Sequence, residues 1–456
     1  MNLCFFLFFV RLLTIGHSDS DVGFGYRVTL AVPTEYSRGF VGRAFIMETN
    51  QMVPNFRVAL TVEAAGQNYS CSLDVLLGEA RVWSSGHLSR FFTAEKCVLE
   101  LTQNGDLQLK GQKERVGWRT GTSGQGVQRL QLLRTGNLVL VDAFNLIKWQ
   151  SFNFPTNIVL WGQRLNVATR LTSFPSNSTS YFTFEILNDK LALYLISNNF
   201  NYAYWEYKPS GNQNITFIKV GTKGLEIYGD RYTRIEVIRS SRPEPVRFMA
   251  LGNETGNLGL YYYSPGGKFE PSFKALNSTC DLPLACKPYG ICTLDGVCSC
   301  IRFIPRGGLG SNCSNETIGG PCHANQVEMI EVQGVSSVLR VPKPDKIRVS
   351  KEECSNLCLN DCNCAAVLYS SGLEECYLYG VVRGVKQVPF GFGSTYMVKV
   401  PKGPGGSHGK GSGLRKWVVV VVGVADGLVI LLILGGVGFY VIRKRRKSLQ
   451  GAEANS

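Results

Sequence analysis

The sequence predicts a mainly β protein with a disulfide-rich segment, a small α+β domain and a single transmembrane helix. Three observations predict this fold class. Short apolar runs separated by glycine and asparagine turns extend from Tyr26 to Lys274. Twelve of the 15 cysteines lie between Cys280 and Cys376. One long apolar segment, Trp417 to Ile442, is followed at once by a basic run.

Residues 1–18 are expected to be a cleaved secretory signal peptide. An apolar run from Leu3 to Val10 leads to small residues at Gly16 and Ser18, although Arg11 interrupts the apolar stretch. Without Cys4 the cysteine count is even, which is typical of proteins that fold in an oxidising compartment.

The region from Tyr26 to Lys274 is predicted to be all-β. Its recurring pattern is an apolar alternation, a turn of Gly with Asn or Asp, and a second alternation, as in RLQLLRTGNLVLV (Arg129 to Val141). Asn, Asp and Gly tolerate the positive φ that tight hairpin turns require. Each repeat therefore predicts a β-hairpin.

Three segments of this region resemble the bulb-type lectin domain of plant S-domain proteins, which include S-locus glycoproteins and G-type lectin receptor kinases. They are VWSSG (Val82 to Gly86), TGNLVLVD (Thr135 to Asp142) and WQSFNFPTN (Trp149 to Asn157). The resemblance implies a three-fold β-prism over residues 24–166. It also implies a core containing Trp83, Trp118 and Trp149. A second, diverged bulb-type lectin-like domain is expected over residues 170–275.

Mannose-binding members of the bulb-type lectins carry the pattern Q-x-D-x-N-x-V-x-Y. The counterparts here are Thr102, Asn104, Asp106, Gln108 and Lys110 in one repeat, and Leu133, Thr135, Asn137, Val139 and Val141 in the next. Only Asn137 and Val139 match, so they are weak candidates for sugar binding. Leu133 has no group that hydrogen-bonds a sugar hydroxyl. A scaffold that recognises protein is the favoured alternative.

Residues 280–313 resemble an EGF-like module. So short a segment buries too little surface to fold alone, and disulfides supply the missing stability. The resemblance implies the pairs Cys280–Cys292, Cys286–Cys298 and Cys300–Cys313. The acidic residues of a calcium-binding EGF module are missing before Cys280, so no calcium site is expected.

Residues 322–400 resemble a PAN/apple domain. Ser350 and Glu353 form a capping box, and Cys354, Cys358 and Cys362 follow at helical spacing, which predicts one helix with three cysteines on one face. The resemblance suggests Cys354–Cys376 and Cys358–Cys364, which leaves Cys322 for Cys362. The two remaining cysteines, Cys71 and Cys97, are assigned to each other in the first lectin unit. A zinc site is the competing interpretation of the helix, and the secreted context disfavours it.

The C-terminal part predicts a glycine-rich stalk at 401–416, a transmembrane helix at 417–442 and a short cytoplasmic tail at 443–456. The apolar segment is long enough to cross a hydrocarbon core of about 30 Å. The basic run from Arg443 to Lys447 places the tail in the cytoplasm, which gives a single-pass type I plasma-membrane protein with an extracellular N-terminus. Because no kinase fits in that tail, the chain resembles the kinase-less PAN domain-containing S-domain proteins.

Seven N-x-Ser/Thr sequons precede the predicted span, as expected for a glycosylated ectodomain. Their asparagines are Asn68, Asn177, Asn214, Asn253, Asn277, Asn312 and Asn315. Within the span, Asp426 lies beside the G-x-x-x-G step of Gly423 and Gly427, a spacing that allows close helix approach. We expect this face to contact another membrane protein. A lone tolerated acid is the simpler alternative.

The composition disfavours several functions. The formal charge is +14, but part of it belongs to the basic run after the span, so nucleic acid is not an expected partner. Only four histidines are present and no catalytic motif occurs, so no enzyme activity and no cofactor or metal are expected. The prediction is a receptor-like surface glycoprotein that binds an extracellular ligand or a partner receptor ectodomain. A cell-wall-facing carbohydrate-binding or adhesive glycoprotein is the alternative.

Overall fold

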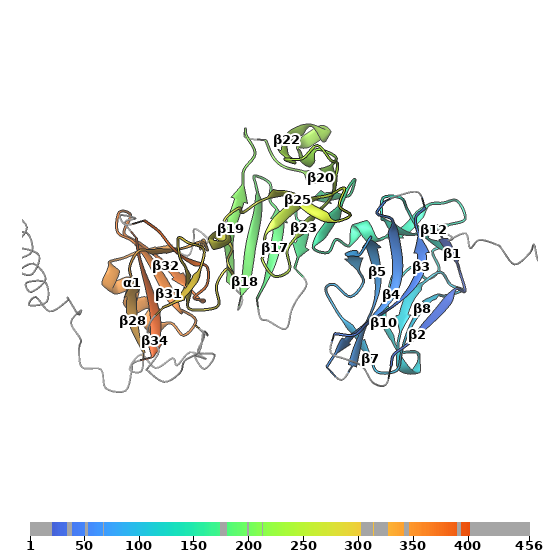
Figure 1. The fold of residues 1–456 in the computed structure, drawn as a ribbon, viewed down its shortest axis with the longest axis horizontal. Coiled ribbons are helices and arrows are strands. Elements are labelled where there is room, and N and C mark those ends of the chain that lie inside the picture. The colour runs from blue at the N-terminus through green and yellow to red at the C-terminus, as the bar shows by residue number, and fades with distance from the viewer. Residues whose placement is uncertain are drawn as a thin grey trace, which may run out of the picture. The chain divides into compact units, whose positions relative to one another are not determined.

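A computed structural model describes most of the region between the predicted signal peptide and the predicted stalk. The described residues are 21–33, 39–50, 53–66, 68–173, 180–197, 200–211, 213–301, 313, 327–341, 346–389 and 394–401. Strands dominate them, and α1 (Lys351–Asn360) is the single α-helix among the described residues (Figure 1). The mainly β fold class is confirmed.

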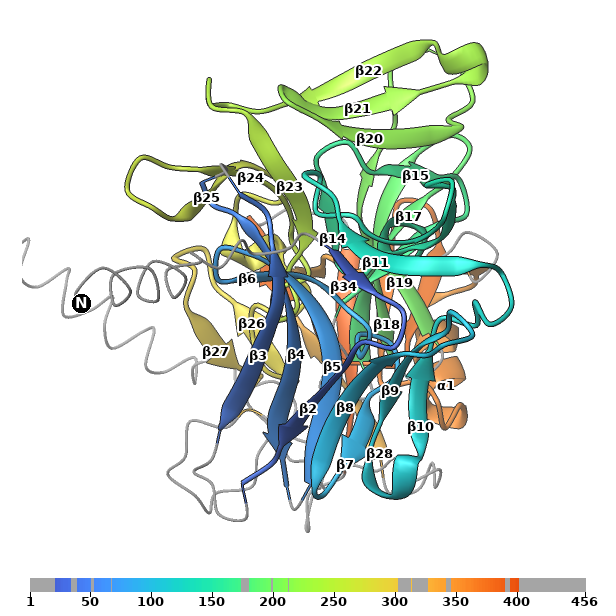
Figure 2. The same cartoon turned by 90° about the vertical axis from the view of Figure 1, so that its right-hand side faces the viewer.

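The first unit is built from three antiparallel sheets (Figure 2). One sheet has the order β1 (Asp21–Gly23), β11 (Val127–Leu132), β12 (Leu138–Asp142), β13 (Ile147–Gln150). The next has the order β10 (Val116–Arg119), β9 (Leu107–Lys110), β8 (Lys96–Leu101), β2 (Arg27–Ala31). The third joins β3 (Val41–Glu48), β4 (Phe56–Ala65), β5 (Asn68–Leu77) and β6 (Ala80–Ser84), with β7 (Phe91–Thr93) beside β5.

The alternation of apolar residues explains this arrangement. Along β4 the side chains of Val58, Leu60 and Val62 all enter the core of the first unit, as every second side chain of a strand must do. The predicted hairpin turns have the expected geometry. Gly105 and Gly136 both have φ of +81°, a conformation that glycine adopts without steric cost.

The second unit repeats the design with three further sheets of four strands. The first has the order β14 (Ile158–Leu160), β23 (Val246–Leu251), β24 (Leu258–Tyr263), β25 (Phe269–Lys274). The next has the order β15 (Arg164–Asn166), β20 (Phe217–Gly221), β21 (Gly224–Tyr228), β22 (Arg234–Arg239). The third has the order β16 (Arg170–Thr172), β17 (Ser180–Ile186), β18 (Leu191–Ser197), β19 (Phe200–Tyr207). Residues 158–166 were expected in the first unit, but they pair with strands of the second. Leu160 of this segment is buried in the core of the first unit, so these residues connect the two units.

A local conformation is repeated in the two units. A short 3-10 turn joins the last two strands of one sheet in each, at Gln112–Glu114 and at Asp230–Tyr232. Its middle residue is left-handed in both, with φ of 53° at Lys113 and 54° at Arg231. This shared and uncommon backbone state supports the expected tandem relation of the two units.

The cysteine-rich segment and the C-terminal unit share a sheet. Its order is β27 (Cys298–Cys300), β26 (Gly290–Cys292), β33 (Val385–Gln387), β29 (Val335–Ser337). A second sheet has the order β28 (Val327–Val332), β34 (Ser394–Pro401), β31 (Ala366–Ser370), β32 (Glu375–Tyr379), β30 (Lys346–Arg348). Helix α1 packs against β28, β31 and β32, which gives the expected α+β unit.

Helix α1 is shorter than expected. Ser350 accepts a hydrogen bond from the Glu353 amide, as the capping box predicts, and Cys354 and Cys358 are buried. The helix ends at Asn360, however, because Asp361 is extended and its carboxylate accepts the Asn363 amide. The prediction that Cys362 lies on the same helix is therefore wrong.

Two large cores stabilise the described region. One belongs to the first unit, and Leu160 and Phe248 from strands of the second unit join it. The other runs from the second unit through the cysteine-rich segment into the C-terminal unit. At this junction Tyr202 stacks on Tyr379 with ring centroids 5.8 Å apart, and its hydroxyl accepts the Gly380 amide at 2.7 Å.

Candidate functional site

In the first repeat of the mannose pattern, the Asp106 side chain forms hydrogen bonds within the protein. Asp106 is buried, and its carboxylate accepts hydrogen bonds from Gln108, Thr120 and the amides of Gly121 and Thr122. Burial is the largest single influence on the pKa of Asp106 and raises it. The hydrogen bonds together outweigh burial, so the pKa of Asp106 is lowered. The carboxylate therefore organises the start of the loop after β10.

The second repeat holds the two weak sugar candidates. The Asn137 side chain is 5% exposed; its amide donates to Gln150 Oε1 at 2.7 Å, and its Oδ1 accepts from Ser151 Oγ and the Phe152 amide, each at 3.2 Å. Val139 is 1% exposed and belongs to the sheet interior. Three of the four hydrogen-bonding positions of the Asn137 amide group are therefore used within the protein.

The expected tryptophan core is present at one end of the first unit. Trp83 comes from β6, Trp118 from β10 and Trp149 from β13, so each of the three sheets contributes one ring from its outermost strand. Their centroids are 5.8 to 6.3 Å apart, and all three pairs have edge-to-face geometry, which is favourable for aromatic rings.

A cavity of about 530 Å³ opens over these rings. Phe154 stacks on Trp149 at 5.7 Å and is 55% exposed, and its carbonyl accepts the Trp83 indole N–H. The rim is polar and includes Arg119, Thr120, Asn153 and Arg170. An aromatic floor with a polar rim fits a ring-shaped ligand that carries hydroxyl groups. The sequence identified the tryptophans as core residues but carries no signal for the rim residues. Arg119 lies on β10, Arg170 lies on β16, and Thr120 and Asn153 lie just after β10 and β13.

His87 closes one side of this cavity. Its Nε2 lies 2.7 Å from the Thr172 carbonyl, and the residue is 4% exposed. Burial lowers the pKa of His87, the hydrogen bond to Thr172 opposes that shift, and the charge of Arg81 adds to it. The neutral ring acts as a structural tie between the loop after β6 and strand β16.

The cysteines pair as the sequence and the resemblance implied wherever both partners are described. The disulfides are Cys71–Cys97, Cys280–Cys292, Cys286–Cys298, Cys300–Cys313, Cys354–Cys376 and Cys358–Cys364. Cys362 is disulfide-bonded, and its expected partner Cys322 lies outside the described residues.

The described sequon asparagines are Asn68, Asn214, Asn253 and Asn277, and all four are exposed. Asn177, Asn312 and Asn315 lie outside the described residues, as do Gly423, Asp426 and Gly427.

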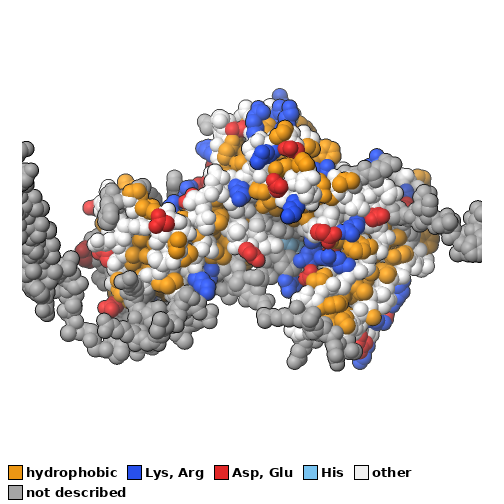
Figure 3. Space-filling model, in the orientation of Figure 1, with side chains coloured by type: hydrophobic (Ala, Val, Ile, Leu, Met, Phe, Trp, Pro, Cys, Tyr) orange, Lys and Arg blue, Asp and Glu red, His pale blue; other side chains and the backbone are white. Residues whose placement is uncertain are grey.

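Within the described part of the chain, no group of three or more His, Cys, Asp or Glu residues is placed to hold a metal ion. No helix in that part is long and apolar enough to span a bilayer, and the predicted span at 417–442 lies outside it. On the face shown in Figure 3, Lys and Arg form several separate groups interspersed with Asp and Glu.

Comparisons with known proteins identify one lectin-type region and a PAN domain in the C-terminal unit. Residues 81–181 match the family described as D-mannose binding lectin, and residues 330–397 match the PAN domain. A G-type lectin S-receptor-like serine/threonine-protein kinase from Arabidopsis thaliana is 23% identical, with 82% of this chain and 47% of the relative covered. A PAN domain-containing protein from the same plant is 26% identical, with 60% of this chain and 58% of the relative covered.

The chain spans about half the length of the curated relatives that it matches. Among solved structures, a monomeric monocot mannose-binding lectin from Gastrodia elata is 19% identical and covers 29% of this chain and 95% of its own. Its TM-score of 0.18 is too low to support a structural argument.

Proposed function

We propose that this chain, a relative of the plant G-type lectin S-receptor-like proteins, is a single-pass plasma-membrane glycoprotein whose ectodomain binds an extracellular ligand or the ectodomain of a partner receptor. The observation that carries the proposal is the state of the sequons and cysteines. Every described sequon asparagine is exposed, and every described cysteine is in a disulfide. Both features suit the extracellular side of a membrane and not a reducing cytosol.

A signal from this ectodomain is proposed to pass laterally through the membrane. Gly423, Asp426 and Gly427 are the residues proposed to contact a second membrane protein. We expect Asp426→Leu to abolish co-precipitation of the partner from plasma membranes, while Leu431→Ala, a matched change in the same span, leaves it intact. Unchanged association of Asp426→Leu would remove this part of the proposal.

Carbohydrate binding is the second candidate function, and the aromatic cavity over Trp83, Trp118 and Trp149 favours it. Asn137 and Val139 are buried, which argues against sugar binding through the mannose pattern. Glycan-array binding of the full-length protein, compared with Phe154→Ala, tests the cavity. Binding that Phe154→Ala reduces supports a sugar site there, and an array without any signal excludes this second function.

A further inference from the structure

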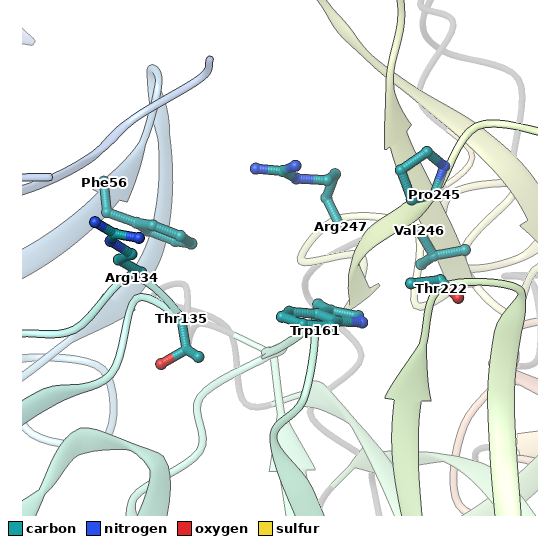
Figure 4. Close-up of a pocket in the computed structure, with 8 residues that line it drawn as sticks. All are labelled: Phe56, Arg134, Thr135, Trp161, Thr222, Pro245, Val246 and Arg247. Atoms are coloured by element: carbon teal, nitrogen blue, oxygen red, sulfur yellow. The ribbon is translucent and has the colours of Figure 1, made fainter. Parts of the chain in front are cut away.

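A separate cavity of about 200 Å³ lies between the hairpin that joins β11 to β12 and the strand β23 (Figure 4). Arg134 and Thr135 come from the tip of the hairpin, Trp161 follows β14, and Arg247 lies on β23. The Arg247 side chain extends above the Trp161 ring toward Phe56 and Arg134. Two cations therefore face a space bounded by aromatic rings.

The two arginines have no protein partner in the described region. Neither guanidinium makes a hydrogen bond or an ion pair with any described residue. Arg247 is half-buried, and this burial lowers the pKa of its guanidinium. Such an unpaired, partly buried cation is unfavourable unless an anion joins it, whereas Arg134 is exposed to water.

The walls of this cavity are fixed by the backbone. The Gly136 amide donates to the Leu133 carbonyl at 2.9 Å, and a Cβ at Gly136 would lie 2.4 Å from the Phe56 ring, so the hairpin tip fits tightly. The Trp161 amide donates to the Arg247 carbonyl at 2.9 Å. Rigid walls reduce the entropy lost when a ligand binds.

We infer that this cavity binds a sugar ring that carries a carboxylate, that is, a uronate unit of an oligosaccharide. The inference rests on the proposed function, because it names a ligand class for the extracellular binding protein. Guanidinium groups form paired, charge-assisted hydrogen bonds with carboxylates. The C–H face of a pyranose ring suits the electron-rich face of Trp161.

The charge of the lining favours an acidic sugar over a neutral one in this cavity. Thr135 and Thr222 carry hydroxyls that can donate to or accept from any sugar, whereas Arg134 and Arg247 add positive charge that only an anionic ring neutralises. None of the described residues that line the cavity is Asp or Glu, so no carboxylate there neutralises the two guanidinium groups. The volume is below the 300–1,000 Å³ or so of drug-sized sites, so one ring enters and the rest of the oligosaccharide stays outside.

The test is calorimetric titration of full-length protein in detergent with trigalacturonate, and with its methyl ester as a neutral control. We expect trigalacturonate alone to bind. Arg134→Gln and Arg247→Gln should each weaken binding about tenfold, the usual loss of a charge-assisted hydrogen bond. Arg43→Gln removes an exposed arginine on β3, outside this cavity, and should leave binding unchanged.

Equal binding of the methyl ester, or unchanged binding by both arginine variants, overturns the inference. Arg134→Lys and Arg247→Lys keep the charge and serve if a glutamine variant fails to fold; they should still bind more weakly than the wild type. Competition by an oligoglutamate peptide that is insensitive to Trp161→Ala would indicate an acidic protein segment instead. If trigalacturonate does not bind but the surface partner is still captured, this inference fails and the proposed function stands.

Discussion

Asn137 shows how a residue can match a binding pattern and yet serve the fold. Its amide bridges Gln150, Ser151 and the Phe152 amide, and so fixes the segment that follows β13. We expect Asn137→Ala to lower the free energy of unfolding by about 1–3 kcal/mol, because buried partners lose their hydrogen bonds. Urea titration measures this loss.

Asn104→Ala is the control, because Asn104 occupies the exposed turn of the preceding repeat. Its effect should stay within about 0.5 kcal/mol. A stable Asn137→Ala protein that has lost mannose binding would show that Asn137 is a sugar ligand after all.

His87 gives the stability of the first unit a pH dependence. Burial lowers its pKa, so the unfolded chain takes up the proton first as the pH falls. The neutral ring therefore makes its full contribution to the free energy of unfolding above the unfolded-state pKa, near 6.5. This contribution is lost as the pH falls from that value to the folded-state pKa. The slope is at most about 1.4 kcal/mol per pH unit for one proton.

We expect wild-type protein to lose more unfolding free energy than His87→Gln between pH 7.5 and pH 5. Urea titrations at the two pH values measure both losses. Equal losses would mean that the proton on His87 does not affect folding.

At the scale of elements, the Cys71–Cys97 disulfide joins β5 to β8 and so connects two sheets of the first unit. Its partners are 26 residues apart, a loop length for which the chain-entropy model gives about 3.5 kcal/mol. The double variant Cys71→Ala, Cys97→Ala should therefore unfold at a lower urea concentration. If the urea midpoint of unfolding does not change, the disulfide does not stabilise this unit and its apolar core alone does.

Tyr202 links the second unit to the C-terminal unit through Tyr379 and Gly380. Tyr202→Phe removes one hydrogen bond and should cost about 1 kcal/mol. Tyr202→Ala also removes the buried ring and should cost about 3–5 kcal/mol. Hydrogen exchange in β31 and β32 measures the effect, and exchange unaffected by Tyr202→Ala would show that the units are energetically independent.

The sequence predicted elements where residue type alone decides the local structure, and failed where a competing local hydrogen bond or a long-range contact decides it. Hairpin turns at Gly105 and Gly136 and the cap at Ser350 follow from residue type alone. The end of α1 depends on a local Asp361 bond that competes with the helix. The boundary between the two lectin-like units depends on the pairing of residues 158–166 with strands far along the chain, which no local pattern reveals.

At the scale of the whole molecule, the order of units was predictable, but the cavities were not. Trp83, Trp118 and Trp149 stand out by composition and were placed in one core correctly. Arg134 and Arg247 are 113 residues apart (247 minus 134), and only folding brings them to one cavity. Two arginines among the 48 basic residues carry no sequence signal of their own.

The described units are proposed to form a glycosylated ectodomain at the cell surface. Intact cells expressing the full chain should be treated with a membrane-impermeant biotin ester, and glycan occupancy should then be mapped by mass spectrometry on the captured protein. We expect the protein to be captured, with glycans on the exposed asparagines Asn68, Asn214, Asn253 and Asn277. Protein that stays unlabelled on intact cells, becomes labelled only after lysis and carries no glycan at these four positions would contradict it.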